Sequence, residues 1–268
     1  MTRDFRERYG PWALVAGASA GLGAAFAEQL AARKLNLVLV ARQETLLTAL
    51  AARLREAHGV EVRVAVADLG APDLLARARE ATAGVEIGLV VYNAAYSLIG
   101  RFLEQPLEDK LRIVNVNCRG PLILADEFGR QMAKRKRGGI LLMSSLAGAR
   151  GSPLVATYAA TKAFNLVLAE SLWDELADEG IDVLACRAGA TRTPAYDASR
   201  PAGKVPIMEP GPVVEEALAA LGRKPSMVPG IVNAIAEFFL GRLLTRRAAI
   251  RIMSRTTRRL YPPGGGRL

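Results

Sequence analysis

Short, continuous apolar runs recur along this chain and alternate with segments that favour helices. Runs such as LNLVLV, IGLVVY, GGILLM and IDVLAC lack the every-second-residue polarity of a strand with one face in water. Strands that are apolar on both faces are typical of parallel sheets, because crossover helices cover both sides of such a sheet. We therefore predict an α/β fold, with a doubly wound parallel sheet of about seven strands and helices on both faces.

The expected strands cover residues near 12–16, 36–41, 60–66, 88–92, 138–143 and 181–186, with a short seventh near 226–229. No linker or internal repeat divides the 268 residues, and 51% of them are hydrophobic, which is enough for one large core. We expect a single domain over residues 1–268.

The segment WALVAGASAGLGAAFAEQL breaks a buried strand with Gly17, Gly21 and Gly23 before a helix over residues 24–33. Glycine allows a tight turn and close approach of a ligand to the backbone. Free backbone N–H groups and the helix dipole then favour a phosphate. The pattern indicates a phosphate site of a dinucleotide, and an ordinary glycine-rich turn is the alternative.

Tyr158 and Lys162 stand four residues apart in TYAATKAF, so on a helix they project from the same face. A free tyrosine has a pKa of about 10, too high for proton exchange near neutrality. A neighbouring ammonium group is expected to lower that pKa and to make Tyr158 a general acid and base.

These motifs, in this order and at these intervals, resemble the short-chain dehydrogenase/reductase family from about residue 10 to about residue 230. The opening YGPWALVAGAS is similar to its hydroxysteroid dehydrogenase and 3-oxoacyl-CoA reductase branch. The resemblance implies a Rossmann-type fold and a catalytic set of Asn117, Ser145, Tyr158 and Lys162. Ser145 lies thirteen residues before Tyr158, as in the family pattern, and Ser144 is expected to face away.

The resemblance also assigns roles. Tyr158 would exchange a proton with the substrate oxygen, Ser145 would hold that oxygen, Lys162 would bind the nicotinamide ribose, and Asn117 would anchor a water that relays protons. The implied cofactor contacts are Gly17, Ser19, Ala20, Gly21, Leu22, Gly23, Arg42, Asp68, Leu69, Asn93, Ala94, Tyr158, Lys162, Gly189, Thr191 and Thr193.

Three residues depart from the family pattern: Ala16 replaces threonine, Ala95 replaces the glycine of Asn-Ala-Gly, and Ala188 replaces the proline of Pro-Gly. Each change replaces one small residue by another small residue. Only Ala95 would be strained, if its backbone required a positive φ.

The second strand ends in Ala41 and Arg42, without the acid that usually binds the ribose 2′-hydroxyl of NAD. An arginine there can bind a 2′-phosphate, so NADP(H) is preferred over NAD(H). The alternative is that Arg42 only begins a solvated loop, and nearby Glu44 weakens the preference.

No metal centre is expected, because the chain has one histidine, His58, and a catalytic zinc site needs about three clustered ligands. Cys118 and Cys186 are far apart in the sequence and are read as reduced thiols. The charged start and the absence of a long apolar run indicate a cytoplasmic protein.

The charge is concentrated in a basic C-terminal extension over residues 238–268, which holds eight arginines and no acid or lysine. Without those eight, the 36 basic residues become 28 against 26 acidic. On a helix after Gly241, arginines 247, 251, 255 and 258 share one face, opposite Ala249, Ile252, Met253 and Leu260. This pattern predicts peripheral contact with an anionic membrane, or a helix folded over the substrate pocket or a subunit contact; nucleic acid is not expected.

Five prolines and two glycines over about residues 193–212 predict a substrate lid, or a merely irregular loop. Leu146, Leu154, Val155, Ile207 and Met208 would line an apolar pocket. We expect NADPH-dependent interconversion of a lipophilic ketone and a secondary alcohol. The alternatives are sugar or polyol oxidation and a sensor without turnover. By resemblance, helices near 106–134 and 153–179 would form a homodimer or homotetramer.

Overall fold

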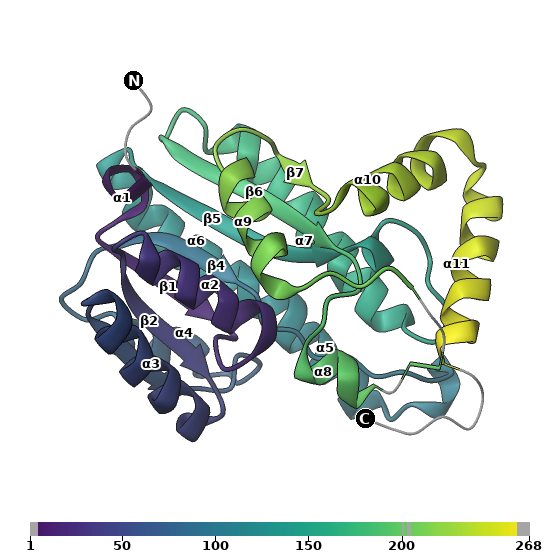
Figure 1. Ribbon diagram of the computed structural model, residues 1–268, viewed down its shortest axis with the longest axis horizontal. Coiled ribbons are helices and arrows are strands. Elements are labelled where there is room, and N and C mark those ends of the chain that lie inside the picture. The colour runs from purple at the N-terminus through teal and green to yellow at the C-terminus, as the bar shows by residue number, and fades with distance from the viewer. Residues whose placement is uncertain (1–4, 200, 203–204, 262–268) are drawn as a thin grey trace.

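Among the described residues, seven strands form one parallel sheet in the order β3-β2-β1-β4-β5-β6-β7 (Figure 1). The computed structural model describes residues 5–199, 201–202 and 205–261. The strands are β1 (Trp12–Ala16), β2 (Asn36–Ala41), β3 (Val62–Val66), β4 (Ile87–Tyr92), β5 (Gly138–Ser145), β6 (Ile181–Ala188) and β7 (Ser226–Met227). The predicted seven-stranded parallel sheet is confirmed.

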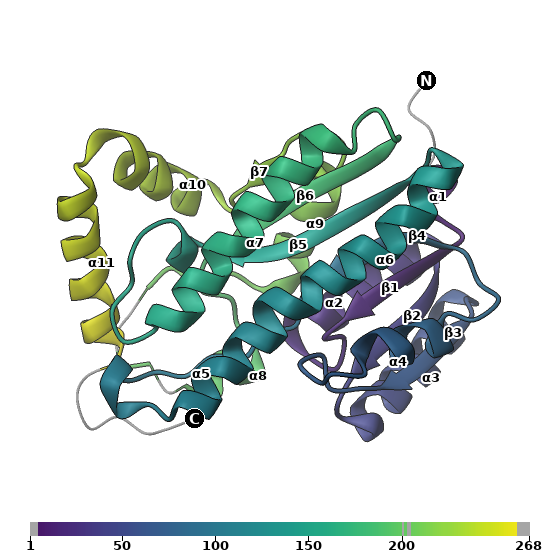
Figure 2. The same cartoon turned by 180° about the vertical axis from the view of Figure 1, so that it is seen from behind.

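Helices cover both faces of this sheet, each over its own apolar cluster (Figures 1 and 2). One face carries α2 (Gly21–Ala32), α3 (Glu44–His58) and α9 (Pro210–Ala220). The other carries α4 (Leu74–Ala81), α6 (Gly120–Arg135) and α7 (Ala156–Glu175). Since β1, β4 and β5 are buried between these layers, their continuous apolar sequences follow from the architecture.

The remaining helices lie at the ends and edges of the sheet. They are α1 (Phe5–Tyr9), η1 (Phe102–Glu104), α5 (Leu107–Val114), η2 (Asn115–Arg119), η3 (Leu146–Gly148), α8 (Pro194–Ala198), α10 (Ile231–Phe238), η4 (Phe239–Leu243) and α11 (Arg246–Leu260). Both ribbon views show α10 and α11 projecting beyond the sheet on one side of the molecule (Figures 1 and 2). Within the part of the chain described, no helix is long and apolar enough to cross a membrane.

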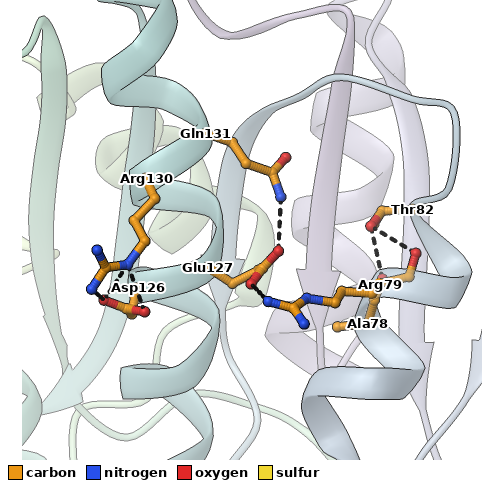
Figure 3. Close-up of polar contacts among 7 residues, drawn as sticks. All are labelled: Ala78, Arg79, Thr82, Asp126, Glu127, Arg130 and Gln131. Carbon is orange, nitrogen blue, oxygen red and sulfur yellow. Dashed lines mark hydrogen bonds and ion pairs between the residues drawn. The ribbon is translucent and has the colours of Figure 1, made fainter.

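A polar contact fastens α4 to α6, as Figure 3 shows. Arg79 pairs with Glu127 across the two helices at 2.7 Å, and the second carboxylate oxygen of Glu127 accepts a hydrogen bond from Gln131 at 3.0 Å. The carboxylate of Glu127 is only 15% exposed, so its pairing is better shielded than that of Asp126 with Arg130 beside it. This contact steadies α6, which continues directly from η2 and therefore from Asn117.

The strand bounds differ from the predicted ones in informative places. The third strand begins at Val62 instead of 60, and the seventh covers only two residues. The fifth and sixth strands each continue two residues further, because Ser144 pairs with Arg187 and Ser145 with Ala188 in the ladder. Ser144, Ser145 and Arg187 are polar, so apolar runs alone did not predict this extension. The extension places Ser145 at the last position of its strand.

The order of the strands reverses between β1 and β4, whose connections run to opposite sides of the sheet. A crevice opens outside the carboxyl ends of the strands at such a switch point, and ligands of doubly wound folds bind there. The glycine turn after β1 and the Asn-Ala pair after β4 both lie at this point.

Candidate active site

The glycine turn after β1 has a backbone that side chains would not tolerate. Gly17 and Gly21 have φ angles of 84° and 57°, in the region that favours glycine. A Cβ on Gly17 would lie 2.6 Å from the Cα of Ala94, and one on Gly21 would lie 2.7 Å from the Cγ2 of Thr193. A Cβ on Gly23 would overlap the carbonyl oxygen of Gly17. The turn is thus packed between β4 and the loop after β6.

Helix α2 begins at this turn without a capping side chain. Its N-cap residue, Ala20, has an extended backbone and no side-chain hydrogen bond to the first turn. The leading N–H groups of a helix have no partner within the helix, and here no acidic side chain occupies the first turn. These donors and the helix dipole are suited to hold a diphosphate, so the predicted residues fit this part of a dinucleotide.

The next strand ends support the same crevice. Asn93 donates from Nδ2 to the carbonyl oxygen of Gly17 at 3.0 Å and so ties the ends of β1 and β4 together. Asp68 accepts from the N–H of Gly70 at 2.9 Å and pairs with Arg112 at 3.2 Å. One cavity extends from the glycine turn along these strand ends. Its lining includes Ser19, Leu22, Asp68, Leu69, Asn93 and Ala94.

Ala95 does not have a positive φ; of the described non-glycine residues only Lys34, Lys136 and Leu154 do. Replacement of the family glycine by Ala95 therefore introduces no backbone strain at this position.

Arg42 follows the last residue of β2, is exposed, and lines the same cavity. Among the described residues no carboxylate forms an ion pair with it. A free guanidinium at the end of this strand suits a phosphate on the ribose, since it can bind a tetrahedral anion through two N–H groups.

Ser145, Tyr158 and Lys162 line the cavity together. Helix α7 presents Tyr158 and Lys162 on one face, and the Nζ of Lys162 lies 5.6 Å from the centre of the Tyr158 ring. Lys162 is buried and donates from Nζ to the carbonyl oxygen of Met143 in β5 at 2.8 Å. The strand and the helix thus bring together three groups that are up to 17 residues apart in the sequence.

The pKa values of Tyr158 and Lys162 differ from the expectation. Burial raises the pKa of Tyr158 above its usual value, and the Ser145 hydroxyl only partly opposes this effect. Burial lowers the pKa of Lys162 to about 8. The prediction that the lysine lowers the pKa of the tyrosine is therefore wrong for the protein alone, because removal from water disfavours the charged form of both groups.

Asn117 lies in the π-helical turn η2 and is fully buried. Its Oδ1 accepts a hydrogen bond from the N–H of Tyr96 at 2.8 Å. Its Nδ2 donates to the carbonyl oxygen of Tyr96 and to the hydroxyl oxygen of Thr161, both at 3.0 Å. Asn117 is not among the residues that line the cavity, and both amide hydrogens are engaged. The side chain of Asn117 thus joins η2 to α7, and its predicted contact with a relaying water stays a prediction.

Ser144, the alternative to Ser145, donates from its hydroxyl to the carbonyl oxygen of Lys162 at 2.7 Å and is buried. Its hydroxyl is thus used to hold α7 on β5. Ser145 instead accepts from the N–H of Ala147 at 3.2 Å as the cap of η3, which leaves its hydroxyl hydrogen available to a substrate oxygen.

The loop after β6 closes over the glycine turn. Gly189 packs so closely under Asn233 that a Cβ would lie 2.8 Å from its Nδ2. Thr193 caps α8 by accepting from the N–H of Tyr196 at 3.1 Å. Thr191 pairs with Met208. The predicted residues of this loop all line the cavity: Gly189, Thr191 and Thr193.

One cavity of about 940 Å³ joins the glycine turn, the Tyr158 group and the C-terminal extension. The underside of α11 contributes Ile252, Met253 and Leu260 to its wall, and Ala249 is fully buried. The arginines at 247, 251, 255 and 258 are exposed on the other side of the helix. Of the alternatives for this extension, the structure shows the helix folded over the pocket.

The substrate lid over 193–212 stays a prediction, and residues 200, 203 and 204 of this stretch lie outside the described residues. The cavity is lined from α8 to Pro206 in the described part of this stretch, but α9 begins at Pro210. Leu146 and Val155 line the cavity as predicted, whereas Leu154, Ile207 and Met208 do not. The sulfur of Met208 accepts a hydrogen bond from the Nδ2 of Asn233 at 3.5 Å.

Sequence analysis missed several residues of the substrate end, among them Tyr196, Asn233 and Tyr261. Tyr261 reaches the hydroxyl of Ser199 at 3.3 Å, and the N–H of Ala202 donates to the carbonyl oxygen of Leu260 at 2.8 Å. These contacts join two segments about 60 residues apart, so no local signal could have revealed them. Among the described residues no group of histidine, cysteine and carboxylate side chains could hold a metal.

The fold and this site define a dinucleotide-binding oxidoreductase of the Rossmann type. A sequence model of the short chain dehydrogenases matches residues 11–203, and the chain belongs to the short-chain dehydrogenase/reductase family. It acts as an NAD(P)-dependent oxidoreductase on hydroxyl or carbonyl groups.

Individual relatives agree with the branch predicted from the sequence. The 7beta-hydroxysteroid dehydrogenase of Collinsella aerofaciens is 34% identical over 237 residues, which cover 86% of this chain and 90% of that protein. The very-long-chain 3-oxoacyl-CoA reductase of Pyricularia oryzae is 35% identical over 218 residues, 80% of this chain and 65% of that protein.

Two solved structures are similar over most of the chain. One, from work on the stereoselectivity of 7beta-hydroxysteroid dehydrogenase, has a TM-score of 0.88 and 33% identity, and covers 93% of this chain and 99% of its own. A short-chain dehydrogenase from Sphingobium yanoikuyae in complex with NADPH has a TM-score of 0.76 and 35% identity over 82% and 87% of the two chains.

Proposed function

We propose that this enzyme interconverts a lipophilic ketone and a secondary alcohol with NADP(H) as its cofactor. The observation that carries this proposal is a cavity lined by the glycine turn, by Ser145 and Tyr158, and by the apolar side of α11. A cofactor and an apolar substrate could therefore meet beside Ser145 and Tyr158.

During reduction Tyr158 donates its proton to the carbonyl oxygen, and during oxidation it accepts the proton of the alcohol. Tyr158 carries its proton at neutral pH, as the donor role requires, but burial raises its pKa. Lys162 and the bound cofactor would have to offset this rise for efficient proton exchange. Ser145 donates a hydrogen bond to the same oxygen and fixes its position. Lys162 would bind the nicotinamide ribose through its ammonium group, and the side chain of Asn117 joins η2 to α7.

The nicotinamide cofactor, when bound, supplies or accepts the hydride. The N-terminus of α2 with Gly21, Leu22 and Gly23 would hold its diphosphate, Asp68 its adenine end, and Arg42 its 2′-phosphate. The uncapped helix terminus and the close-packed glycines are the features that fit this group.

An apolar substrate is favoured by the composition of the cavity wall around α11, which contains Leu240, Ile252, Met253 and Leu260. The relatives named above act, by their names, on a hydroxysteroid and on a very-long-chain acyl thioester. Both substrates have large apolar bodies, as this wall requires.

The direct test is Tyr158→Phe, assayed by NADPH absorbance with a 7-oxosteroid as substrate. Loss of the proton donor should lower kcat by about 100-fold or more, while NADPH binding changes little. A variant that keeps most of its reductase rate would show that Tyr158 is not the acid.

The cofactor preference is tested separately with Arg42→Ala. Its kcat/KM with NADPH should fall by about 10-fold or more, because a charge-assisted contact is lost, while the value with NADH stays similar. Equal losses with both cofactors would argue against a 2′-phosphate site at Arg42.

Oxidation of a sugar or polyol is the second candidate within the family, and a substrate series with NADPH and NADP would separate it. The apolar wall under α11 disfavours it, since a sugar would leave hydroxyl groups without partners there. A sensor without turnover is disfavoured by the presence of Ser145, Tyr158 and Lys162 in one cavity.

Two predictions about partners remain. Family members are commonly oligomeric, and exposed apolar side chains on α5, α6 and α7, such as Leu111, Leu122 and Val167, favour a homodimer or homotetramer through these helices. The arginine face of α11 favours contact with an anionic membrane, although its apolar side is used by the cavity. Liposome flotation of the protein, with and without residues 242–268, tests this contact.

A further inference from the structure

The charged residues along the cavity wall are Arg42, Asp68, Arg112, Arg150, Lys162 and Glu237. Most of them are accounted for. Asp68 pairs with Arg112, and Glu237 pairs with Arg187 of β6 at 2.7 Å. Arg42 and Lys162 belong to the proposed cofactor site. Arg150 is left with no carboxylate partner among the described residues.

Arg150 lies five residues after Ser145, in the loop between η3 and α7, and reaches the substrate end of the cavity. Its Nη1 donates to the carbonyl oxygen of Ala149 at 2.6 Å and its Nη2 to that of Gly241 in η4 at 2.8 Å. A guanidinium group has five N–H donors, so three remain uncommitted, and its Nε is shielded from solvent without a partner.

The surroundings of Arg150 make this positive charge costly to leave unpaired. The wall of the same cavity contains apolar residues of α10, η4 and α11, including Ala236, Leu240 and Ile252. Attraction between charges is stronger near such a surface than in water, because the effective dielectric constant is lower. Because Arg187 and Glu237 form an ion pair, the group formed by Arg150, Arg187 and Glu237 carries one net positive charge.

We propose that Arg150 is a specificity-determining residue that binds an anionic group of the substrate, a carboxylate or another oxyanion, at the end of an otherwise apolar molecule. This inference rests on the proposed function and narrows its substrate class to amphipathic ketones and alcohols with a negative charge remote from the reacting carbon. The apolar body lies under α11, and the anion completes the hydrogen bonds of the guanidinium group.

A purely structural role for Arg150 makes a different prediction. Its bond to Gly241 fastens η4, and thus the whole extension, to the loop after β5. If that were its only role, its loss would weaken the binding of charged and uncharged ligands to the same extent.

The test uses a steroid with a 7-oxo group and a side-chain carboxylate, together with its methyl ester. Binding of each to the full-length protein is measured by calorimetry, without turnover, and NADPH-dependent reduction is measured separately. The wild-type protein should bind the acid about 10- to 100-fold more tightly than the ester, as expected for a charge-assisted contact.

In Arg150→Met this preference should disappear through weaker binding of the acid, while binding of the ester changes less than about 2-fold. Arg150→Lys should keep part of the preference, because it keeps the charge but loses the planar donor arrangement. Arg242→Met is the matched control: it removes an exposed arginine of the same extension that does not line the cavity, and the preference should persist.

Equal binding of acid and ester by the wild-type protein, or equal losses of both in Arg150→Met, would overturn the proposal. The proposed function would fail differently. Neither compound would then be reduced with NADPH, yet the calorimetric preference for the acid and its dependence on Arg150 could still be measured.

Discussion

The two ends of the cavity are built in different ways. At the dinucleotide end, the walls are strand ends, a glycine turn and the start of α2, and most of the contacts come from the backbone. At the substrate end, the walls are side chains from α8, α10 and α11, which belong to the last third of the chain. One end is fixed by close packing of main chain, the other by an added helix.

The two ends of the cavity should therefore respond differently to substitutions. Where backbone packs on backbone, a single added methyl group has no room, because neither side can move without disturbing the sheet. Where a helix covers a cavity through apolar side chains, it can be loosened without unfolding the sheet beneath it. The following predictions test this contrast, from the largest expected effect to the smallest.

Gly23→Ala should disrupt the dinucleotide end of the cavity. The new Cβ would overlap the carbonyl oxygen of Gly17, so the turn and α2 must separate. We expect the free energy of unfolding to fall by about 1–3 kcal/mol and NADPH affinity to fall by about 100-fold. Chemical denaturation and NADPH titration measure these effects.

Gly211→Ala is the control for this substitution, since a Cβ on Gly211 would meet nothing within 4 Å. It should leave NADPH affinity unchanged and should not lower the free energy of unfolding, which we expect to rise by about 0.4–1 kcal/mol because alanine restricts the unfolded chain. Normal NADPH binding by Gly23→Ala would show that the close packing of the turn does not matter.

The substrate end should respond to Ala249→Asp. Ala249 lies on the buried side of α11, and an ionised carboxylate there would lack partners, so the helix should separate from the pocket. We expect KM for the lipophilic ketone to rise by about 10-fold or more, with NADPH affinity unchanged. Steady-state kinetics and NADPH titration distinguish the two ends.

Arg251→Asp places the same carboxylate two residues away on the exposed face of α11 and should leave KM nearly unchanged. If both variants behave alike, the helix does not cover the substrate.

Lys162→Met should separate stability from activity at the junction of the two ends. Burial lowers the pKa of Lys162 to about 8 from 10.5, so below pH 8 the folded protein carries a buried charge that the unfolded chain exposes to water. Removing it should abolish turnover yet raise the free energy of unfolding at pH 7 by up to about 3 kcal/mol, less the lost bond to Met143.

The pH dependence has a definite sign. Between about pH 8 and 10.5 the unfolded state binds more protons at this lysine than the folded state, so wild-type stability rises with pH relative to Lys162→Met. Denaturation curves at pH 7, 9 and 10.5 measure this convergence. The exposed Lys224→Met serves as the control, and a constant difference across the range would contradict the interpretation.

The smallest effect is expected for Ala95→Gly, which restores the family residue. Because Ala95 does not have a positive φ, glycine relieves no strain and only increases the conformational freedom of the unfolded chain. The free energy of unfolding should fall by about 0.4–1 kcal/mol without a gain in activity. Greater stability in Ala95→Gly would reveal strain at this position.

The catalytic group shows how far motif and spacing alone could lead. The sequence placed Ser145, Tyr158 and Lys162 in one site, and the structure brings them to one cavity. The sequence did not reveal the direction in which the pKa of Tyr158 changes, because this direction depends on how much water the surrounding chain removes. Nor did it reveal that Asn117 is enclosed by Tyr96 and Thr161.

The sequence alone determined the parallel sheet, the glycine turn with its helix, and the amphipathic character of residues 246–260. Each of these follows from properties read within a few residues: continuous apolar runs, the φ angles that only glycine tolerates, and the period of an α-helix. Only the tertiary structure decided what covers the apolar side of α11 and which charges lack a partner. Those outcomes depend on contacts between segments far apart in the chain, such as Arg150 with Gly241 and Ser199 with Tyr261. No local pattern encodes such contacts, because they exist only once the sheet has brought its strand ends together.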